Sequence, residues 1–316
     1  MISPVRNPRR RAARLMATLL LVLVASSLLA PDAVRSWADT QPAGWRRVLA
    51  RTWSGPTGGL ARDAGLDRPL TAVRDALDPD PAVVFPVPAD PKRGLVVRRA
   101  SPTDPLRVLA VGDSLMLDLQ YGMERVLEPR PDVEIEGRGA LGFGFTVPHW
   151  DWEEDVLADY SRLVAEVRPD VVVVMIGANE FEGHVLEGEA LEPGSERWTE
   201  VLAERAGEAM AQWRAEGAPV YWWTTPRMRD TRFLTDDLNA IWEATTTAWG
   251  DGVTSLDSMV VLGDASGAYR DRMVDENGRV VDLRKAQGVH FHEVGADLLA
   301  RQLEERLVAD GWLVDD

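Results

Sequence analysis

Four short segments of the chain carry residues that could together perform acyl transfer. Gly112-Asp113-Ser114 holds a serine, 139–144 is rich in glycine, Gly177-Ala178-Asn179 holds an asparagine, and His290 lies near the C-terminus. A neutral serine hydroxyl is a poor nucleophile unless a base such as histidine takes its proton. Backbone N–H groups and an asparagine amide can stabilise the oxyanion that forms when a serine attacks a carbonyl. These residue types therefore suit a serine nucleophile, a histidine base and an oxyanion-binding site.

Each segment taken alone also has a plainer interpretation. Ser114 could be a helix N-cap, because serine is favoured at that position. Asn179 could occupy a left-handed turn, which asparagine tolerates well. The glycine loop lacks the G-x-G-x-x-G spacing of a dinucleotide site, and the lysine of a phosphate-binding loop is missing, so nucleotide binding is disfavoured. The four segments gain weight because they occur in one order beside predicted strands and helices.

Alternating strands and helices begin at residue 106 and continue to the C-terminus. The clearest strand is Val171–Ile176, an unbroken apolar run that is typical of a strand buried on both faces. The alternation predicts a parallel sheet covered by helices on both faces, a three-layer α/β/α sandwich. Ligands bind at the carboxyl ends of the strands in such sheets, and three of the four segments directly follow a strand. The predicted strands are 106–111, 133–136, 171–176, 220–224 and 253–256, and the predicted helices are 115–127, 151–168, 195–216, 235–249 and 293–309.

The four segments resemble the sequence blocks of the SGNH (GDSL) hydrolase superfamily. The resemblance covers residues 106 to about 308, and it matches the serine, glycine, asparagine and histidine blocks to Ser114, Gly142, Asn179 and His290, with Gly139 as the alternative glycine. It implies a flavodoxin-like parallel sheet. Further short matches point to a bacterial exported or membrane-tethered subgroup of unknown function. They are GDSLM at 112–116, DW at 151–152, TPRMRD at 225–230, LN at 238–239 and GVHF at 288–291.

The resemblance implies a serine esterase or O-acyltransferase mechanism that needs no cofactor. His290 would take the proton of Ser114, and the serine would attack an acyl ester. The oxyanion would be held by the backbone N–H groups of Ser114 and Gly142 and by the side chain of Asn179, each donor being worth ~3–4 kcal/mol of barrier. Water would then give an esterase, and a sugar hydroxyl would give an acyltransferase. The expected substrate is an acyl, foremost acetyl, ester of a cell-envelope glycan or a related small-molecule ester.

One position departs from the family pattern. The residue three before the histidine is normally aspartate, and here it is Gln287. A glutamine carbonyl could orient the imidazole without stabilising its charge, and the comparable Asp-to-Asn change in a serine protease costs roughly 10⁴ in turnover. Three outcomes stay open. Gln287 could serve as a neutral orienter in a Ser–His dyad, another carboxylate such as Asp282 or Glu293 could replace it, or the domain could be an inactive module that binds a glycan or a protein partner.

The predicted substrate contacts are Asp113, Trp150, Trp152 and Phe291. The two tryptophans follow the glycine loop and could stack on a sugar ring, although a place in the core or at its rim suits them equally. His290 and His292 lack an obvious third ligand, so we predict no metal site.

The composition excludes several other functions. The 316 residues include 35 Lys and Arg, 51 Asp and Glu, and no cysteine. Residues 1–30 contain five arginines and no acid, which leaves 30 basic and 51 acidic side chains, a net charge of −21, for the rest. An acidic body disfavours nucleic-acid binding. The absence of cysteine removes disulfides, thiolate metal sites and a thiol nucleophile.

The N-terminal residues predict export. Five arginines between residues 6 and 14 precede the uncharged apolar run 15–30, a pattern typical of a signal peptide or a signal anchor. The run is shorter than the ~20 residues of a comfortable spanning helix, and a small-x-small cleavage site occurs at 36–38. We expect the anchored form, at the cell membrane with the C-terminal domain outside the cytoplasm. The predicted regions are 1–38 (signal or anchor), 39–105 (Pro-rich linker with short helices) and 106–316 (SGNH-like domain).

Overall fold

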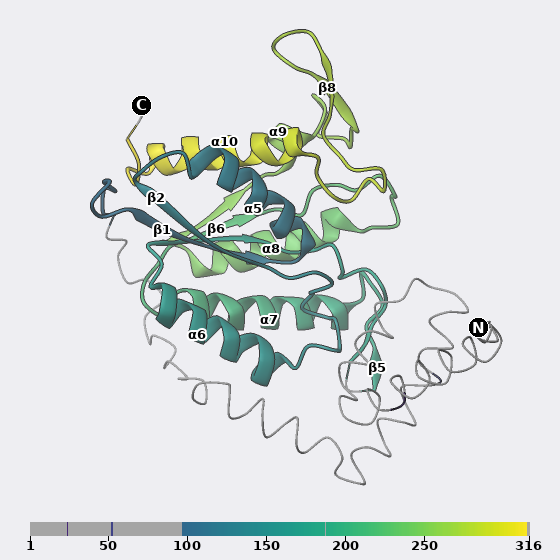
Figure 1. The fold of residues 1–316 in the computed structure, drawn as a ribbon. Coiled ribbons are helices and arrows are strands. Elements are labelled where there is room, and N and C mark those ends of the chain that lie inside the picture. The colour runs from purple at the N-terminus through teal and green to yellow at the C-terminus, as the bar shows by residue number, and fades with distance from the viewer. Residues whose placement is uncertain (1–23, 25–51, 53–96, 187, 315–316) are drawn as a thin grey trace, which may run out of the picture. The chain divides into compact units, whose positions relative to one another are not determined.

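A parallel sheet organises the part of the chain that this computed structural model describes, namely residues 24, 52, 97–186 and 188–314. The five strands lie in the order β2-β1-β3-β6-β7, and every neighbouring pair is parallel (Figure 1). This flavodoxin-like order creates a switch point between β1 and β3, where the chain reverses its direction of progress across the sheet. The predicted fold class is confirmed. The strands are β1 (Leu106–Gly112), β2 (Val133–Gly139), β3 (Val171–Met175), β6 (Val220–Trp223) and β7 (Val253–Leu256).

Helices cover both faces of the sheet. α5, α9 and α10 pack on one face, and α6, α7 and α8 pack on the other. Figure 1 shows α5 and α10 on one side of the strands and α6 and α7 on the opposite side. The helices are α5 (Ser114–Leu127), α6 (Ala158–Val167), α7 (Glu196–Trp213), α8 (Thr235–Trp249), α9 (Met259–Leu262) and α10 (Glu293–Ala309).

Alternating strand residues supply the two hydrophobic cores. In β1, Val108 and Ala110 belong to the core under α5 and α10, whereas Leu109 and Val111 belong to the core under α6 and α7. This alternation follows from the two-residue repeat of a strand. Burial of a Val or Leu side chain contributes roughly 1.5–3 kcal/mol, so both cores fix the sheet and its strand ends.

Several elements differ from the predicted ones. The predicted helix 151–168 starts as a π-helix, η1 (Trp152–Leu157), and continues as α6, which ends at Arg168 in a left-handed conformation with φ of 47° before a proline. Two hairpins were not predicted, β4–β5 (Val185–Leu186, Glu189–Ala190) and β8–β9 (Arg272–Val274, Val280–Asp282). Their strands have two or three residues, too few to show a repeat in the sequence.

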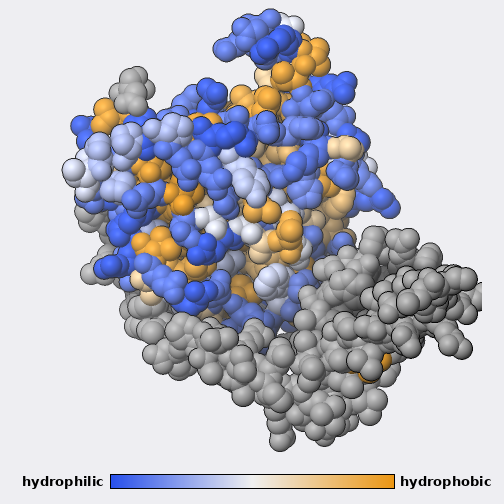
Figure 2. Space-filling model, viewed as in Figure 1, coloured by the Kyte–Doolittle hydropathy of each residue, from blue (hydrophilic) through white to orange (hydrophobic). Residues whose placement is uncertain are grey.

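The β8–β9 hairpin projects away from the sheet (Figure 1). Val274 and Val280 pair across it and are 60% and 67% exposed. Figure 2 shows hydrophobic residues beneath the hydrophilic tip of this projection.

The predicted signal or anchor segment and most of the predicted linker lie outside the described residues. Within the described part of the chain, no helix has the length and apolar character required to cross a bilayer.

Candidate active site

Ser114 and His290 meet at the carboxyl end of β1. The Ser114 hydroxyl oxygen lies 2.9 Å from His290 Nε2. Ser114 is the first residue of α5, but the N-cap is Asp113, whose carboxylate accepts the Leu115 N–H at 2.7 Å. Because Asp113 caps the helix, the Ser114 hydroxyl is available to the histidine, and the plainer N-cap interpretation of Ser114 does not apply.

The turn before Ser114 is held against the end of β3. A side chain at Gly112 would place its Cβ 2.0 Å from the Met175 carbonyl oxygen, so only glycine allows this close approach of two backbones. One carboxylate oxygen of Asp113 accepts the N–H groups of Gly177 at 2.8 Å and Ala178 at 2.6 Å. These contacts join the serine turn directly to the turn that carries the asparagine.

Asp113 therefore positions the site from beneath it. Its side chain is fully buried, so the predicted direct contact between Asp113 and substrate does not fit the structure. Burial raises the pKa of Asp113 to about 6, and the backbone N–H groups of Gly177, Ala178 and Leu115 oppose the rise. The carboxylate is aimed at backbone donors on two strand ends, which is why it is unavailable to a ligand.

Asn179 is linked to the glycine loop. Its side-chain amide donates to the Phe143 carbonyl oxygen at 2.6 Å, which leaves the second amide hydrogen for another acceptor. Gly142 lies in an exposed turn at φ of +72°, and a Cβ there would meet nothing within 4 Å. Gly139, in contrast, packs against α5, because its Cβ would lie 2.6 Å from the Leu117 nitrogen. The open turn at Gly142 is thus the part of the loop that can present a backbone N–H to a ligand.

Glu180 holds the same loop and was missed in the sequence. It is buried and accepts hydrogen bonds from the Phe145 N–H at 2.7 Å, the Thr146 N–H at 3.0 Å and the Thr146 hydroxyl at 2.6 Å. Burial raises the pKa of Glu180 to about 7, against the effect of these donors. In the sequence, only its position next to Asn179 could have indicated a role for Glu180, because an isolated glutamate in a loop usually lies in solvent.

His290 sits in a turn that directs Gln287 into solvent. The Gly288 N–H donates to the Lys285 carbonyl at 2.8 Å, and the Lys285 N–H donates to the His290 carbonyl at 2.8 Å. Gly288 has φ of +74°, a conformation that suits glycine, and the Arg229 N–H donates to its carbonyl. Gln287 is exposed at the tip of this turn and makes no hydrogen bond within the described part of the chain. The interpretation of Gln287 as the orienting residue is therefore not what the structure shows.

The other predicted carboxylates are not bonded to His290 either. Asp282 pairs with Arg272, and Glu293 is exposed at the start of α10. Among the described residues, His290 Nδ1 has no hydrogen-bond partner. Burial lowers the pKa of His290 below its ordinary value; nearby Asp118 opposes this effect, while Lys285 and Arg284 add to it. The neutral imidazole that a general base requires is therefore favoured at pH 7.

The aromatic candidates lie in or at the rim of the cores. Phe291 is 1% exposed, with the Arg284 guanidinium 5.2 Å from its ring centre, so it does not reach substrate. Trp150 is half-buried, edge-on to the Phe143 ring. The Trp152 ring lies 5.0 Å from the Arg205 guanidinium. Both tryptophans therefore lie at the rim of the core, which is one of the positions that the sequence analysis allowed for them.

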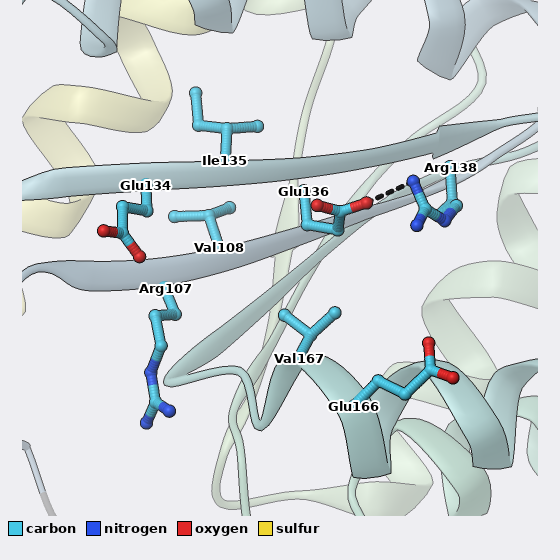
Figure 3. Close-up of a pocket in the computed structure, with 8 residues that line it drawn as sticks. All are labelled: Arg107, Val108, Glu134, Ile135, Glu136, Arg138, Glu166 and Val167. Carbon is cyan, nitrogen blue, oxygen red and sulfur yellow. Dashed lines mark ion pairs between the residues drawn. The ribbon is translucent and has the colours of Figure 1, made fainter.

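A separate hollow of about 360 Å³ lies against β1 and β2, beside the end of α6 (Figure 3). Three glutamates and two arginines line it, and Glu136 pairs with Arg138 there. Ser114, Asn179 and His290 are not among its lining residues, so we assign it no part in their chemistry.

Residues 107–306 match the family described as "Protein of unknown function (DUF459)". No curated protein matches the sequence. One similar solved structure is the lipopolysaccharide acetyltransferase periplasmic domain of Salmonella ser. Paratyphi A, with 11% identity, a TM-score of 0.46, and coverage of 65% of this chain and 84% of that chain. A carbohydrate esterase family 3 protein from Talaromyces cellulolyticus has 13% identity and a TM-score of 0.44, over 65% of this chain and 97% of that chain.

The C-terminal catalytic domain of Streptococcus pneumoniae peptidoglycan O-acetyltransferase A has 13% identity and a TM-score of 0.38, over 65% of this chain and 93% of that chain. The family match extends over well more than half of the residues and includes Ser114, Gly142, Asn179 and His290. The chain belongs to the DUF459 family.

Proposed function

We propose that this protein is an extracytoplasmic serine esterase or O-acyltransferase that acts on acyl esters, foremost acetyl esters, of a cell-envelope glycan. The observation that carries the proposal is the 2.9 Å contact between the Ser114 hydroxyl and His290 Nε2 at the switch point of the sheet. The glycan and the cell envelope rest on the predicted export of the chain and on the family resemblance.

The proposed mechanism uses the Ser114–His290 pair together with Gly142 and Asn179. His290 Nε2 takes the proton as the Ser114 oxygen bonds to the acyl carbon, and an oxyanion forms. The Ser114 and Gly142 N–H groups and the free hydrogen of the Asn179 amide donate to it. The ester C–O bond then breaks, and the leaving alcohol takes the proton from His290. Water or a sugar hydroxyl attacks the acyl-serine by the same steps, which restores the serine.

The chain itself can be tested with acyl esters of increasing specificity. We expect release of acetate from p-nitrophenyl acetate and, faster, from an O-acetylated glycan. Addition of a free acceptor glycan separates the two reactions, because a transferase then forms acetylated acceptor in place of acetate. If no acyl ester is cleaved or transferred under any of these conditions, the enzyme proposal fails.

A second candidate function follows from His290 Nδ1, which has no hydrogen-bond partner in the part of the chain that the structure describes. Without an orienting acceptor, the domain could bind a glycan in the cell envelope without turnover. Glycan binding that is unchanged in Ser114→Ala, together with no ester turnover, would favour this module over the enzyme.

Activity should persist below the ordinary pKa of histidine. The reactive form has a neutral His290, and burial lowers the pKa of this group. We therefore expect kcat/KM to rise with pH through an apparent pKa below ~6.5. A profile of kcat/KM between pH 4.5 and 8 checks this, and a midpoint above 6.5 would contradict the buried, base-competent histidine.

Replacement of Gln287 should have little effect. The side chain is exposed and has no bond to the imidazole, so Gln287→Ala should change kcat/KM by no more than about two-fold, as is usual at the surface. The neighbouring exposed variant Ala286→Ser serves as a control for changes in the turn. A loss above ten-fold in Gln287→Ala alone would show that the amide orients His290 in solution.

A further inference from the structure

Asp118 lies one helical turn after Ser114 on α5, on the same face of the helix. Its side chain is 11% exposed. One carboxylate oxygen accepts from Lys285 Nζ at 2.6 Å, and the other accepts the Phe291 N–H at 3.0 Å. Asp118 thus holds the His290 turn at both ends, at the residue that begins it and at the residue directly after the histidine.

Asp118 also differs in charge from the other groups that act on the His290 imidazole. The groups that act on the imidazole are Asp118 from α5 and Lys285 and Arg284 from the histidine turn itself. Arg284 is 4% exposed, stacks between the rings of Tyr269 and Phe291, and donates to the Val289 carbonyl. Two cations therefore act on the imidazole electrostatically, and Asp118 is the carboxylate among the described residues that opposes them.

We propose that Asp118 is the positioning residue of His290, a part that the family pattern would give to an aspartate at position 287. It fixes the histidine through the Phe291 amide and offsets the charge of the imidazolium that forms when Ser114 loses its proton. Asp118 acts through the backbone and through space, since it makes no bond to His290 Nδ1. This assignment rests on the proposed function, because only a histidine that accepts a proton needs such support.

The charges predict effects of opposite sign for two variants. A negative charge near the imidazole favours its protonated form, and a positive charge disfavours it. Asp118→Asn keeps the size of the side chain and removes the negative charge, so the pKa of His290 should fall. Lys285→Gln removes a positive charge from a half-exposed position and leaves Asp118 bonded to Phe291, so the pKa should rise. A purely structural role would not produce this pair of signs.

The test is an NMR titration of the His290 ring in the full-length chain, with its signals assigned through His290→Gln. We expect shifts of at least about 0.5 pKa unit, downward in Asp118→Asn and upward in Lys285→Gln, with recovery toward wild type in Asp118→Glu. An unchanged or raised pKa of His290 in Asp118→Asn, or shifts of the same sign in the two variants, would overturn the proposal. If Asp118→Asn fails to fold, Asp118→Ser takes its place in the titration, and an unchanged pKa there overturns the proposal.

This readout does not depend on turnover. Opposite shifts in a protein that cleaves no ester would sink the proposed function and leave the link between Asp118 and His290 standing. Ester cleavage with unchanged titrations would do the reverse. In an active protein, Asp118→Asn should also lower kcat by at least about ten-fold at pH 8, where His290 is already neutral, with a smaller change in KM.

Discussion

Ser114→Ala should lower kcat/KM for acyl-ester hydrolysis at least about 100-fold while the protein stays folded. Loss of the serine of a complete triad costs ~2 × 10⁶ in turnover, and an enzyme without the orienting acid already lacks ~10⁴ of that. The ratio of these two factors gives the loss of turnover that we expect in Ser114→Ala. The Ser114 hydroxyl bonds only to His290 among the described residues, so the free energy of unfolding should fall by only about 1 kcal/mol.

Ser255→Ala is the matched control for this variant. Ser255 is an exposed serine in β7, so its replacement should change neither turnover nor stability. Steady-state hydrolysis and thermal melting of both variants make the comparison. Equal turnover in Ser114→Ala and wild type would mean that any esterase activity belongs to another group.

Asp113→Ala should be the most destabilising single change at the site. The substitution leaves two buried N–H groups, of Leu115 and Gly177, and the partly buried N–H of Ala178 without their acceptor. Each unsatisfied buried donor costs about 1–3 kcal/mol, so the free energy of unfolding should fall by roughly 3–6 kcal/mol. That is a large part of the 5–15 kcal/mol typical of a whole domain, and turnover should be lost with it.

Two further variants make the Asp113 result specific. Asp113→Asn keeps one acceptor oxygen and should cost about half as much, since an amide N–H₂ would face a backbone donor. Asp257→Ala is the matched control, because this exposed aspartate also accepts a backbone N–H, that of Met259, at a strand end. It should cost only about 0.5–2 kcal/mol. Urea denaturation measures all three variants, and an Asp113→Ala cost no larger than that of Asp257→Ala would contradict the buried junction.

The sheet could be predicted because its signals are local. Val171–Ile176 is apolar throughout, and Gly112 directly follows the apolar run 106–111, so the hydrophobic pattern and the glycine identify buried strands without tertiary information. Parallel strands bring their carboxyl ends to one edge. That rule is sufficient to predict that the serine and asparagine turns lie together, and the bonds from Asp113 to Gly177 and Ala178 join them.

The support of His290 could not be predicted, because it depends on contacts between distant segments. Gln287 points to solvent because Gly288 turns the chain and Arg229, from a different loop, holds that turn. In the sequence, Asp118 resembles a surface carboxylate of an amphipathic helix, but in the structure the histidine turn packs on it. Phe291, predicted from the sequence as a substrate contact, is buried in the core beneath α5 and α10, with Arg284 next to its ring.

Covalent labelling tests directly whether Ser114 is a nucleophile activated by His290. Wild-type protein would be treated with a fluorophosphonate at pH 7.5, digested, and mapped by mass spectrometry beside Ser114→Ala and His290→Ala. We expect one adduct, on Ser114, that is absent from Ser114→Ala and forms at least about 100-fold more slowly in His290→Ala. No adduct on wild-type Ser114, or equal labelling in His290→Ala, would contradict it.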